Sequence, residues 1–145
     1  MRALLQRVGR ASVRVDGATV ASVGPGLLIL LGVARGDHPG AEERLAERCA
    51  GLRIFEDAEG KMNRSILDAS GEALIVPQFT LYADTARGRR PGFDHAAPPE
   101  EAESAFIRFC EALSGRGVPT QRGRFGARME VDLVNMGPAT FLLEA

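Results

Sequence analysis

The apolar run from Leu27 to Leu31 is the feature that most limits what this 145-residue chain can fold into. A Gly-Pro-Gly turn at residues 24–26 precedes the run, and no polar residue interrupts it. Successive side chains of a strand point to opposite sides of a sheet, so an uninterrupted apolar strand is buried on both faces. Both faces of the surrounding sheet must therefore be covered. The run is also far shorter than the ~20 residues of a membrane-spanning helix, so we expect no membrane partner.

Other strand-like segments surround this run. Val13 and Val15 alternate with polar residues, and Asp16-Gly17 links them to a second alternating segment, which predicts a hairpin with a type I′ turn. Within the apolar segment at residues 72–82, Pro77 cannot donate a ladder hydrogen bond, so we place it at a strand end, an edge or a bulge. The remaining predicted strands are an opening strand at residues 4–8, a short one at 54–56, and two in residues 129–145 that are broken at 135–138.

Only residues 39–52 and 99–113 have helical periodicity, and Cys49 and Cys110 fall on their apolar faces, as reduced core residues would. Two helices cannot cover both faces of a large sheet. We therefore predict a single α+β domain over residues 1–145, with a mostly antiparallel, curled or barrel-like sheet and two helices. A dimer would cover the remaining apolar face.

Charge and composition exclude several kinds of function. The 18 basic and 19 acidic residues nearly cancel, so no global field attracts nucleic acid, although every basic residue except Lys61 is an arginine. His38 and His95 lie far apart in loop-like sequence, and no spacing resembles a metal site, so we expect neither metal nor cofactor. The N-terminal residues do not resemble a signal peptide and the cysteines are not paired, which predicts a cytoplasmic protein.

Four segments could carry chemistry, each with a plainer alternative. Residues 77–81 (PQFTL) could aim free backbone amides at an oxyanion, although the pattern alone favours an ordinary strand with a half-buried threonine. Residues 135–140 (NMGPAT) could hold a cis X-Pro bond whose carbonyls face one ammonium group, or form a plain turn. Residues 87–93 combine three arginines with Phe93, and in residues 122–129 Arg122, Arg124 and Arg128 flank Phe125. Each segment could bind phosphates and stack a base, or be a solvated loop.

Taken together, the segments resemble the D-aminoacyl-tRNA deacylases, the D-tyrosyl-tRNA deacylase family. The most specific matches are QFTL, part of the usual SQFTL, and the Gly-Pro of the usual N-x-G-P-x-T. The similarity runs from end to end of the chain, through RALLQRV, ASVRVDG, GPGLLILLGV, LRIFEDAEGKMN, QFTLYADT, GRRP, FDHAAPPE, GRFGA and NMGPAT.

The resemblance implies a homodimer that hydrolyses the ester bond of D-aminoacyl-tRNA, and of glycyl-tRNA mischarged on tRNA-Ala, to free amino acid and tRNA. Its active sites would lie across the subunit interface. Gly137 and Pro138 would form a cis peptide that reaches into the partner's site, where their carbonyls capture the α-ammonium of the D-aminoacyl group. An L-residue would then be excluded by main chain rather than by side-chain chemistry. Arg7 would brace this motif.

The resemblance places catalysis at Gln78, Phe79 and Thr80. The backbone amides of Phe79 and Thr80 would meet the ester carbonyl, and the ribose 2′-hydroxyl of the terminal adenosine would assist hydrolysis without a cofactor. Outside this segment, the implied substrate contacts are Phe125 and Met129, and the implied tRNA contacts are Arg89 and Arg90.

Two positions depart from the family pattern. Pro77 stands where most members have serine, and Gly92 stands where serine is common. A Pro-Gln start is similar to a sister branch with relaxed chirality, but that branch lacks Phe at position 79, so we expect D-specificity. Two alternative functions are a non-catalytic module that binds RNA ends and a small-ester hydrolase that uses His95. The intact QFTL and Gly-Pro segments favour the deacylase, because a binding module needs no chirality filter.

Overall fold

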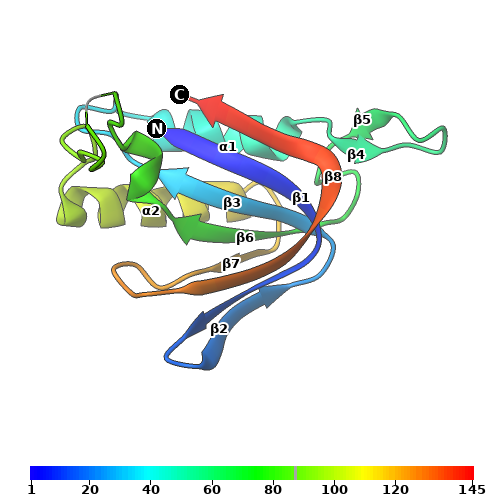
Figure 1. Cartoon of the computed structure of the whole chain (residues 1–145). Helices are drawn as coiled ribbons and strands as arrows, with labels where there is room; N and C mark the ends of the chain where they lie inside the picture. Colours follow the sequence, from blue (N-terminus) through cyan, green and yellow to red (C-terminus); the bar gives the residue numbers. More distant parts are fainter. Residues whose placement is uncertain (87) are drawn as a thin grey trace.

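The computed structural model describes residues 1–86 and 88–145. In chain order its elements are β1 (Arg2–Val15), β2 (Ala18–Val23), β3 (Gly26–Gly32), α1 (Ala41–Gly51), β4 (Phe55–Glu56), β5 (Met62–Arg64), β6 (Glu72–Pro77), the 3-10 helix η1 (Phe79–Tyr82), α2 (Pro99–Ser114), β7 (Thr120–Arg122) and β8 (Glu130–Glu144). Six strands form one sheet in the order β2-β1-β3-β6-β7, and β8 also pairs with β1. The helices lie against this sheet, and the separate β4–β5 hairpin projects from one end of the molecule (Figure 1).

The long strand β1 organises the antiparallel half of the sheet. It pairs with β3 near its start, with β2 near its end, and with β8 along its other edge. Asp16 and Gly17 join β1 to β2 with φ angles of 51° and 79°, the positive values of a type I′ turn, so the predicted hairpin is confirmed. The predicted opening strand and the first hairpin arm are one continuous strand, because pairing with β8 spans both.

The parallel pairings β3–β6 and β6–β7 make the sheet mixed, whereas all pairings of β1 are antiparallel. Each parallel connection contains a helix, α1 before β6 and α2 before β7, and the two helices pack against each other. Strand β7 was not predicted, because Thr120–Arg122 contain no apolar alternation. It pairs with β6 only through three register positions.

Two hydrophobic cores confirm that β3 is buried on both faces. Between the sheet and the helices, Ile29 packs in a cluster with Leu45 and Phe109. On the opposite face, Leu28 and Leu74 belong to a second cluster inside the curl of the sheet. Strand β2 closes this side by returning into contact with β6 and β7. The chain therefore has the predicted α+β fold with two helices and a curled, barrel-like sheet.

The two helices match their predicted positions within two residues, since α1 covers Ala41–Gly51 and α2 covers Pro99–Ser114. Cys49 and Cys110 are buried free thiols on the packed helix faces, as predicted. Burial raises the pKa of each thiol from 9.0 to about 12, so neither is a nucleophile near neutral pH. Across the described residues, no helix is both long enough and apolar enough to span a membrane.

Candidate active site

A cavity of about 620 Å³ lies where β6 ends, and we call it the main cavity. Its walls come from the ends of β3 and β6, the segment before α2, the first half of α2, and the loop between β7 and β8. The lining side chains are mainly apolar, and among the described residues only Arg35 contributes an ionisable group. Four predicted site residues line this cavity: Gln78, Phe79, Phe125 and Met129.

Pro77 ends strand β6, which is one of the positions predicted for it, and the chain then turns into η1. The Gln78 N–H still donates to the Leu31 carbonyl at 2.7 Å, but the next two residues leave the ladder. Phe79 and Thr80 are the first residues of η1, where amides have no acceptor within the helix, and no side chain caps them. Among the described residues neither amide donates to an acceptor, so two backbone donors are free beside the main cavity.

The side chains around these amides are exposed or half-buried, and they contact one another. Phe79 is 57% exposed, and its ring meets Phe93 edge to face with centroids 4.9 Å apart. Gln78 donates its side-chain amide to the Thr80 hydroxyl. Thr80 is exposed in η1, so the interpretation of it as a half-buried strand residue is wrong. Strand β6 ends at Pro77 and only the Gln78 N–H extends its ladder, whereas the apolar pattern continues to Tyr82.

Gly123 allows the loop after β7 to approach the end of β6 closely. Its N–H donates to the Ile75 carbonyl at 2.8 Å. A Cβ at this position would lie 2.8 Å from the Met129 sulfur and 3.6 Å from the Pro77 Cδ. Only glycine fits this spacing without displacing Met129. The backbone at Gly123 thus holds Pro77 and Met129 together as one wall of the main cavity.

Gly137 and Pro138 lie in a bulge of β8, not in a turn between two strands as predicted. On β1, Gln6 pairs with Thr140 and Val8 pairs with Asn135, so residues 136–139 stand opposite Arg7 alone. The surplus residues are forced out of the ladder. The Gly137–Pro138 peptide bond is cis, and both residues are exposed.

Arg7 is buried beneath this bulge and connects it to the β4–β5 hairpin. Its guanidinium donates to the Met136 carbonyl at 3.1 Å, to the Ile54 carbonyl at 2.8 Å and to the Glu56 carboxylate at 3.3 Å. The Asn135 side chain donates to the Arg7 carbonyl at 3.2 Å, from the other side. These contacts join the bulge at Met136 to the chain around β4. Neither Arg7 nor the Gly-Pro pair lines the main cavity of the same chain.

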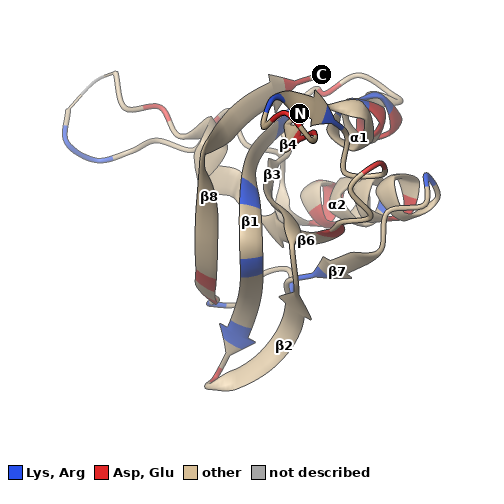
Figure 2. Cartoon of the chain, turned by 90° about the vertical axis from the view of Figure 1, so that its right-hand side faces the viewer, with Lys and Arg blue, Asp and Glu red and all other residues tan. Residues whose placement is uncertain are grey.

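The remaining predicted residues lie away from the main cavity. Arg89 and Arg90 are exposed in a loop closed by two hydrogen bonds between the backbones of Asp84 and Gly92, and Figure 2 shows this loop projecting beyond the body of the protein. Arg87, in the same predicted segment, lies outside the described residues. His95 is exposed and lines a different hollow, so it is not placed to act in the main cavity.

Several cavity residues were not predicted as site residues, among them Arg35 and the segment at residues 96–99. Phe93 also lines the cavity, and the sequence offered it only as the phenylalanine of the arginine-rich segment 87–93. The segment FDHAAPPE contains most of these residues and was one of the family matches. Its apolar and proline residues carry no chemical signature, so only the fold reveals that they face the same space.

Comparison with known proteins identifies the family. Residues 4–144 match the family model described as D-Tyr-tRNA(Tyr) deacylase. The chain belongs to the D-Tyr-tRNA(Tyr) deacylase family. It is thus a hydrolase, an enzyme of the D-aminoacyl-tRNA deacylase type, and the predicted resemblance is confirmed.

Curated relatives agree with this assignment, and solved structures share the fold. The D-aminoacyl-tRNA deacylase of Symbiobacterium thermophilum is 56% identical over 145 residues, covering 100% of this chain and 96% of the relative. That of Thermomicrobium roseum is 57% identical and covers 100% and 94%. The structure of a c-Myc DNA unwinding element binding protein has a TM-score of 0.94 at 39% identity, covering 100% and 99% of the two chains. A probable eukaryotic D-amino acid tRNA deacylase shares the fold, with a TM-score of 0.82 at 21% identity and coverage of 99% and 98%.

Proposed function

We propose that the main cavity binds the 3′-terminal adenosine of D-aminoacyl-tRNA and that the chain hydrolyses its ester bond there. The observation that carries this proposal is the pair of backbone amides at Phe79 and Thr80, which lack internal acceptors beside an apolar cavity. A cavity of about 620 Å³ falls within the range typical of small-ligand sites. The aromatic rings of Phe93 and Phe125 in its walls suit an adenine base.

In the proposed reaction, a water oxygen attacks the ester carbonyl carbon, and the bond from that carbon to the ribose 3′-oxygen breaks. The amides of Phe79 and Thr80 donate to the oxyanion that forms on the carbonyl oxygen. The departing 3′-oxygen takes the proton that the water loses, with the neighbouring 2′-hydroxyl assisting. The products are the free amino acid and tRNA. This route uses the substrate's own hydroxyl, which fits a cavity whose only ionisable lining group among the described residues is Arg35.

The chirality filter that we propose comes from a second copy of the chain. The bulge at Gly137 and Pro138 is exposed, and the carbonyls of these two residues would bind the α-ammonium group in the partner's main cavity. A side chain of L configuration would meet this backbone, whereas a D side chain points away and glycine has none. Glycyl-tRNA mischarged on tRNA-Ala would therefore also be a substrate. The bonds from Arg7 and Asn135 support this role, because they hold the bulge in one position.

Strand β8 supports the homodimer. Among the described strands it pairs only with β1, so its outer edge is open. Val134 is 40% exposed, Met136 49% and Leu142 52%, which places large apolar side chains along this strand. Open edges with apolar side chains favour association. Dimerisation would cover them and bring each bulge to the other subunit. We place this dimer in the cytoplasm, where charged tRNA is found.

The test compares hydrolysis of D-Tyr-tRNA and L-Tyr-tRNA under identical conditions. We expect the D substrate to react at least about 100-fold faster, since the filter excludes rather than merely disfavours the L side chain. A D substrate ending in 2′-deoxyadenosine should react slowly. Binding of both charged tRNAs without acceleration over spontaneous hydrolysis would instead support the alternative of a non-catalytic RNA-end-binding module.

A further inference from the structure

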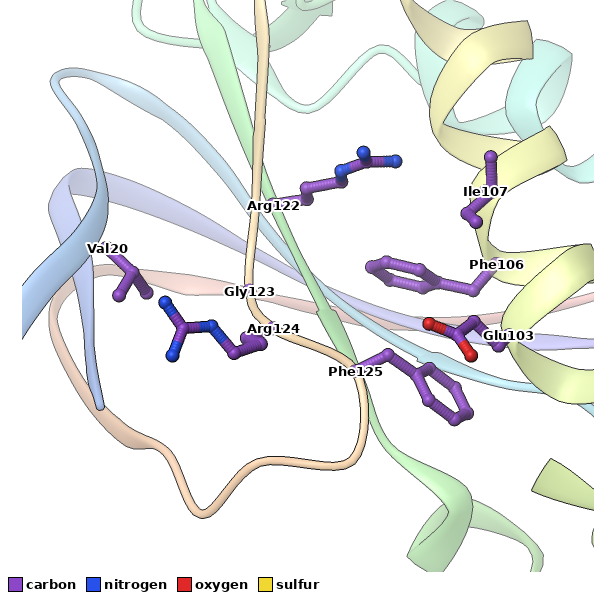
Figure 3. Close-up of a pocket in the computed structure, with 8 residues that line it drawn as sticks. All are labelled: Val20, Glu103, Phe106, Ile107, Arg122, Gly123, Arg124 and Phe125. Atoms are coloured by element: carbon purple, nitrogen blue, oxygen red, sulfur yellow. The ribbon is translucent and has the colours of Figure 1, made fainter. Parts of the chain in front are cut away.

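A second cavity of about 320 Å³ adjoins the main cavity, and we call it the side cavity. Phe106 and Phe125 line both cavities, and their ring centroids are 6.2 Å apart, so these rings form a shared wall. Gly123 contributes its backbone to the side cavity while packing against Pro77 and Met129 of the main cavity. The remaining lining residues, drawn in Figure 3, are Val20, Glu103, Ile107, Arg122 and Arg124.

The side cavity carries three exposed charges. Figure 3 shows that Arg122 extends towards α2 and that Arg124 extends the opposite way, towards Val20. The carboxylate of Glu103 lies on the helix wall, next to the rings of Phe106 and Phe125. In the part of the chain that the structure describes, none of these three charged groups takes part in an ion pair. A ligand can therefore use both guanidiniums and the carboxylate without breaking an existing ion pair.

The proposed catalytic geometry gives the direction in which RNA would leave the main cavity. The ester would lie at the Phe79 end of the main cavity, so the adenosine would extend towards the other wall, at Phe106 and Phe125. The 5′ side of this adenosine then faces the wall that the two cavities share. This step rests on the function proposed above.

We propose that the side cavity binds the nucleotide that precedes the terminal adenosine. Arg122 and Arg124 would each contact one of the phosphates that flank this nucleotide, because the two guanidiniums point in opposite directions and do not converge on one phosphate. The Glu103 carboxylate repels phosphate but accepts a hydrogen bond from an exocyclic amino group, as acidic side chains accept from cytosine N4. One nucleotide thus meets all three charges, with its phosphates at the arginines and its base at the helix wall.

Another basic hollow, near Arg2 and Arg35, is less suited to RNA. The Arg2 guanidinium already donates to the Glu144 carboxylate at 2.6 Å and to the Leu81 carbonyl at 2.9 Å. It also lies 4.6 Å from the centroid of the Tyr82 ring. A phosphate there would have to compete with these contacts, whereas the arginines of the side cavity take part in no ion pair within the described residues.

The experiment measures by calorimetry how tightly two non-hydrolysable ligands bind. The short ligand is adenosine that carries a D-tyrosyl group through an amide in place of the ester, and the long ligand is pCpA that carries the same D-tyrosyl amide. We expect pCpA to bind at least about tenfold more tightly at 50 mM salt. For two phosphates on a single strand, the logarithm of the binding constant should fall with the logarithm of the salt concentration with a slope of about −1.4. The gain in affinity should therefore shrink roughly 7-fold between about 50 mM and 200 mM salt. The double variant R122Q/R124Q should lose most of the gain. The control R44Q removes an exposed arginine on α1 that lines neither cavity, and it should keep the gain.

The outcomes separate this inference from the proposed function. If the short ligand binds but pCpA gives no gain, or the double variant keeps the gain, the side-cavity assignment is wrong and the main cavity assignment stands. If neither ligand binds, the proposed function fails and this inference fails with it. A pUpA ligand lacks the exocyclic amino group, so its gain should be smaller, and an equal gain would contradict the role of Glu103.

Discussion

Replacing Arg7 with methionine tests whether one buried side chain stabilises the fold and positions the Gly-Pro bulge. Methionine keeps much of the length of the side chain but removes every donor. The Ile54 carbonyl loses its 2.8 Å bond at a buried residue, and the Met136 carbonyl loses its 3.1 Å bond at a residue that is 49% exposed. A buried acceptor left without a donor costs ~1–3 kcal/mol, and a partly hydrated one costs less.

The ion pair from Arg7 to Glu56 adds little, because the Glu56 side chain is 58% exposed and such pairs contribute ~0–1 kcal/mol. Together these losses predict that R7M lowers the free energy of unfolding by ~2–4 kcal/mol. For a chain of this size the melting temperature should fall by roughly 6–12 °C.

Urea titration of R7M and the wild type measures this loss, with E56Q as the control that removes only the exposed partner. Deacylation of D-Tyr-tRNA is then assayed well below both melting temperatures. We expect the folded R7M enzyme to be slower, because the bulge is no longer held, whereas E56Q should be within ~1 kcal/mol of the wild type and nearly as active. A loss of stability below ~1 kcal/mol in R7M, or full activity of the folded variant, would refute this reasoning.

Three further predictions concern other parts of the fold. In a urea titration, G26A should lower the free energy of unfolding by at least ~3 kcal/mol, because the added Cβ would lie 1.8 Å from the Glu72 carbonyl oxygen. The matched control is G51A, whose Cβ would meet nothing within 4 Å. T80A should keep kcat/KM within about tenfold of the wild type, since the backbone amide is proposed to act; a loss of ~10²–10³-fold would indicate a role for the hydroxyl. The pKa of Cys49 is raised from 9.0 to about 12 by burial, so the folded state holds this proton more tightly than the unfolded state, and stability should fall as pH rises above 9. The slope of that fall should be smaller in C49A.

The candidate site was predictable only in part. Gln78 and Phe79 were identified through the family resemblance, and Pro77 marked a possible strand end, although the pattern alone favoured an ordinary strand beyond it. Arg122 and Arg124 were noted only as arginines beside a phenylalanine. Their proposed role in the side cavity depends on residues of α2 that lie beside them in space. A turn separates α2 from β7 in the chain, so no local sequence pattern shows that these residues are neighbours.

What the sequence alone determined are the features that arise from neighbouring residues. The positive φ angles at Asp16 and Gly17, the apolar faces of the two helices and the two-sided burial of β3 all follow from local conformational preference and periodicity. The tertiary structure decided the rest. The bulge at residues 136–139 exists because β1 offers only Arg7 opposite it. The main cavity exists because the ends of β3 and β6, the start of α2 and the loop between β7 and β8 meet at one place. Strand register and the closing of a cavity depend on contacts between residues that are far apart in the chain. The energies of such contacts cannot be read from a short stretch of sequence.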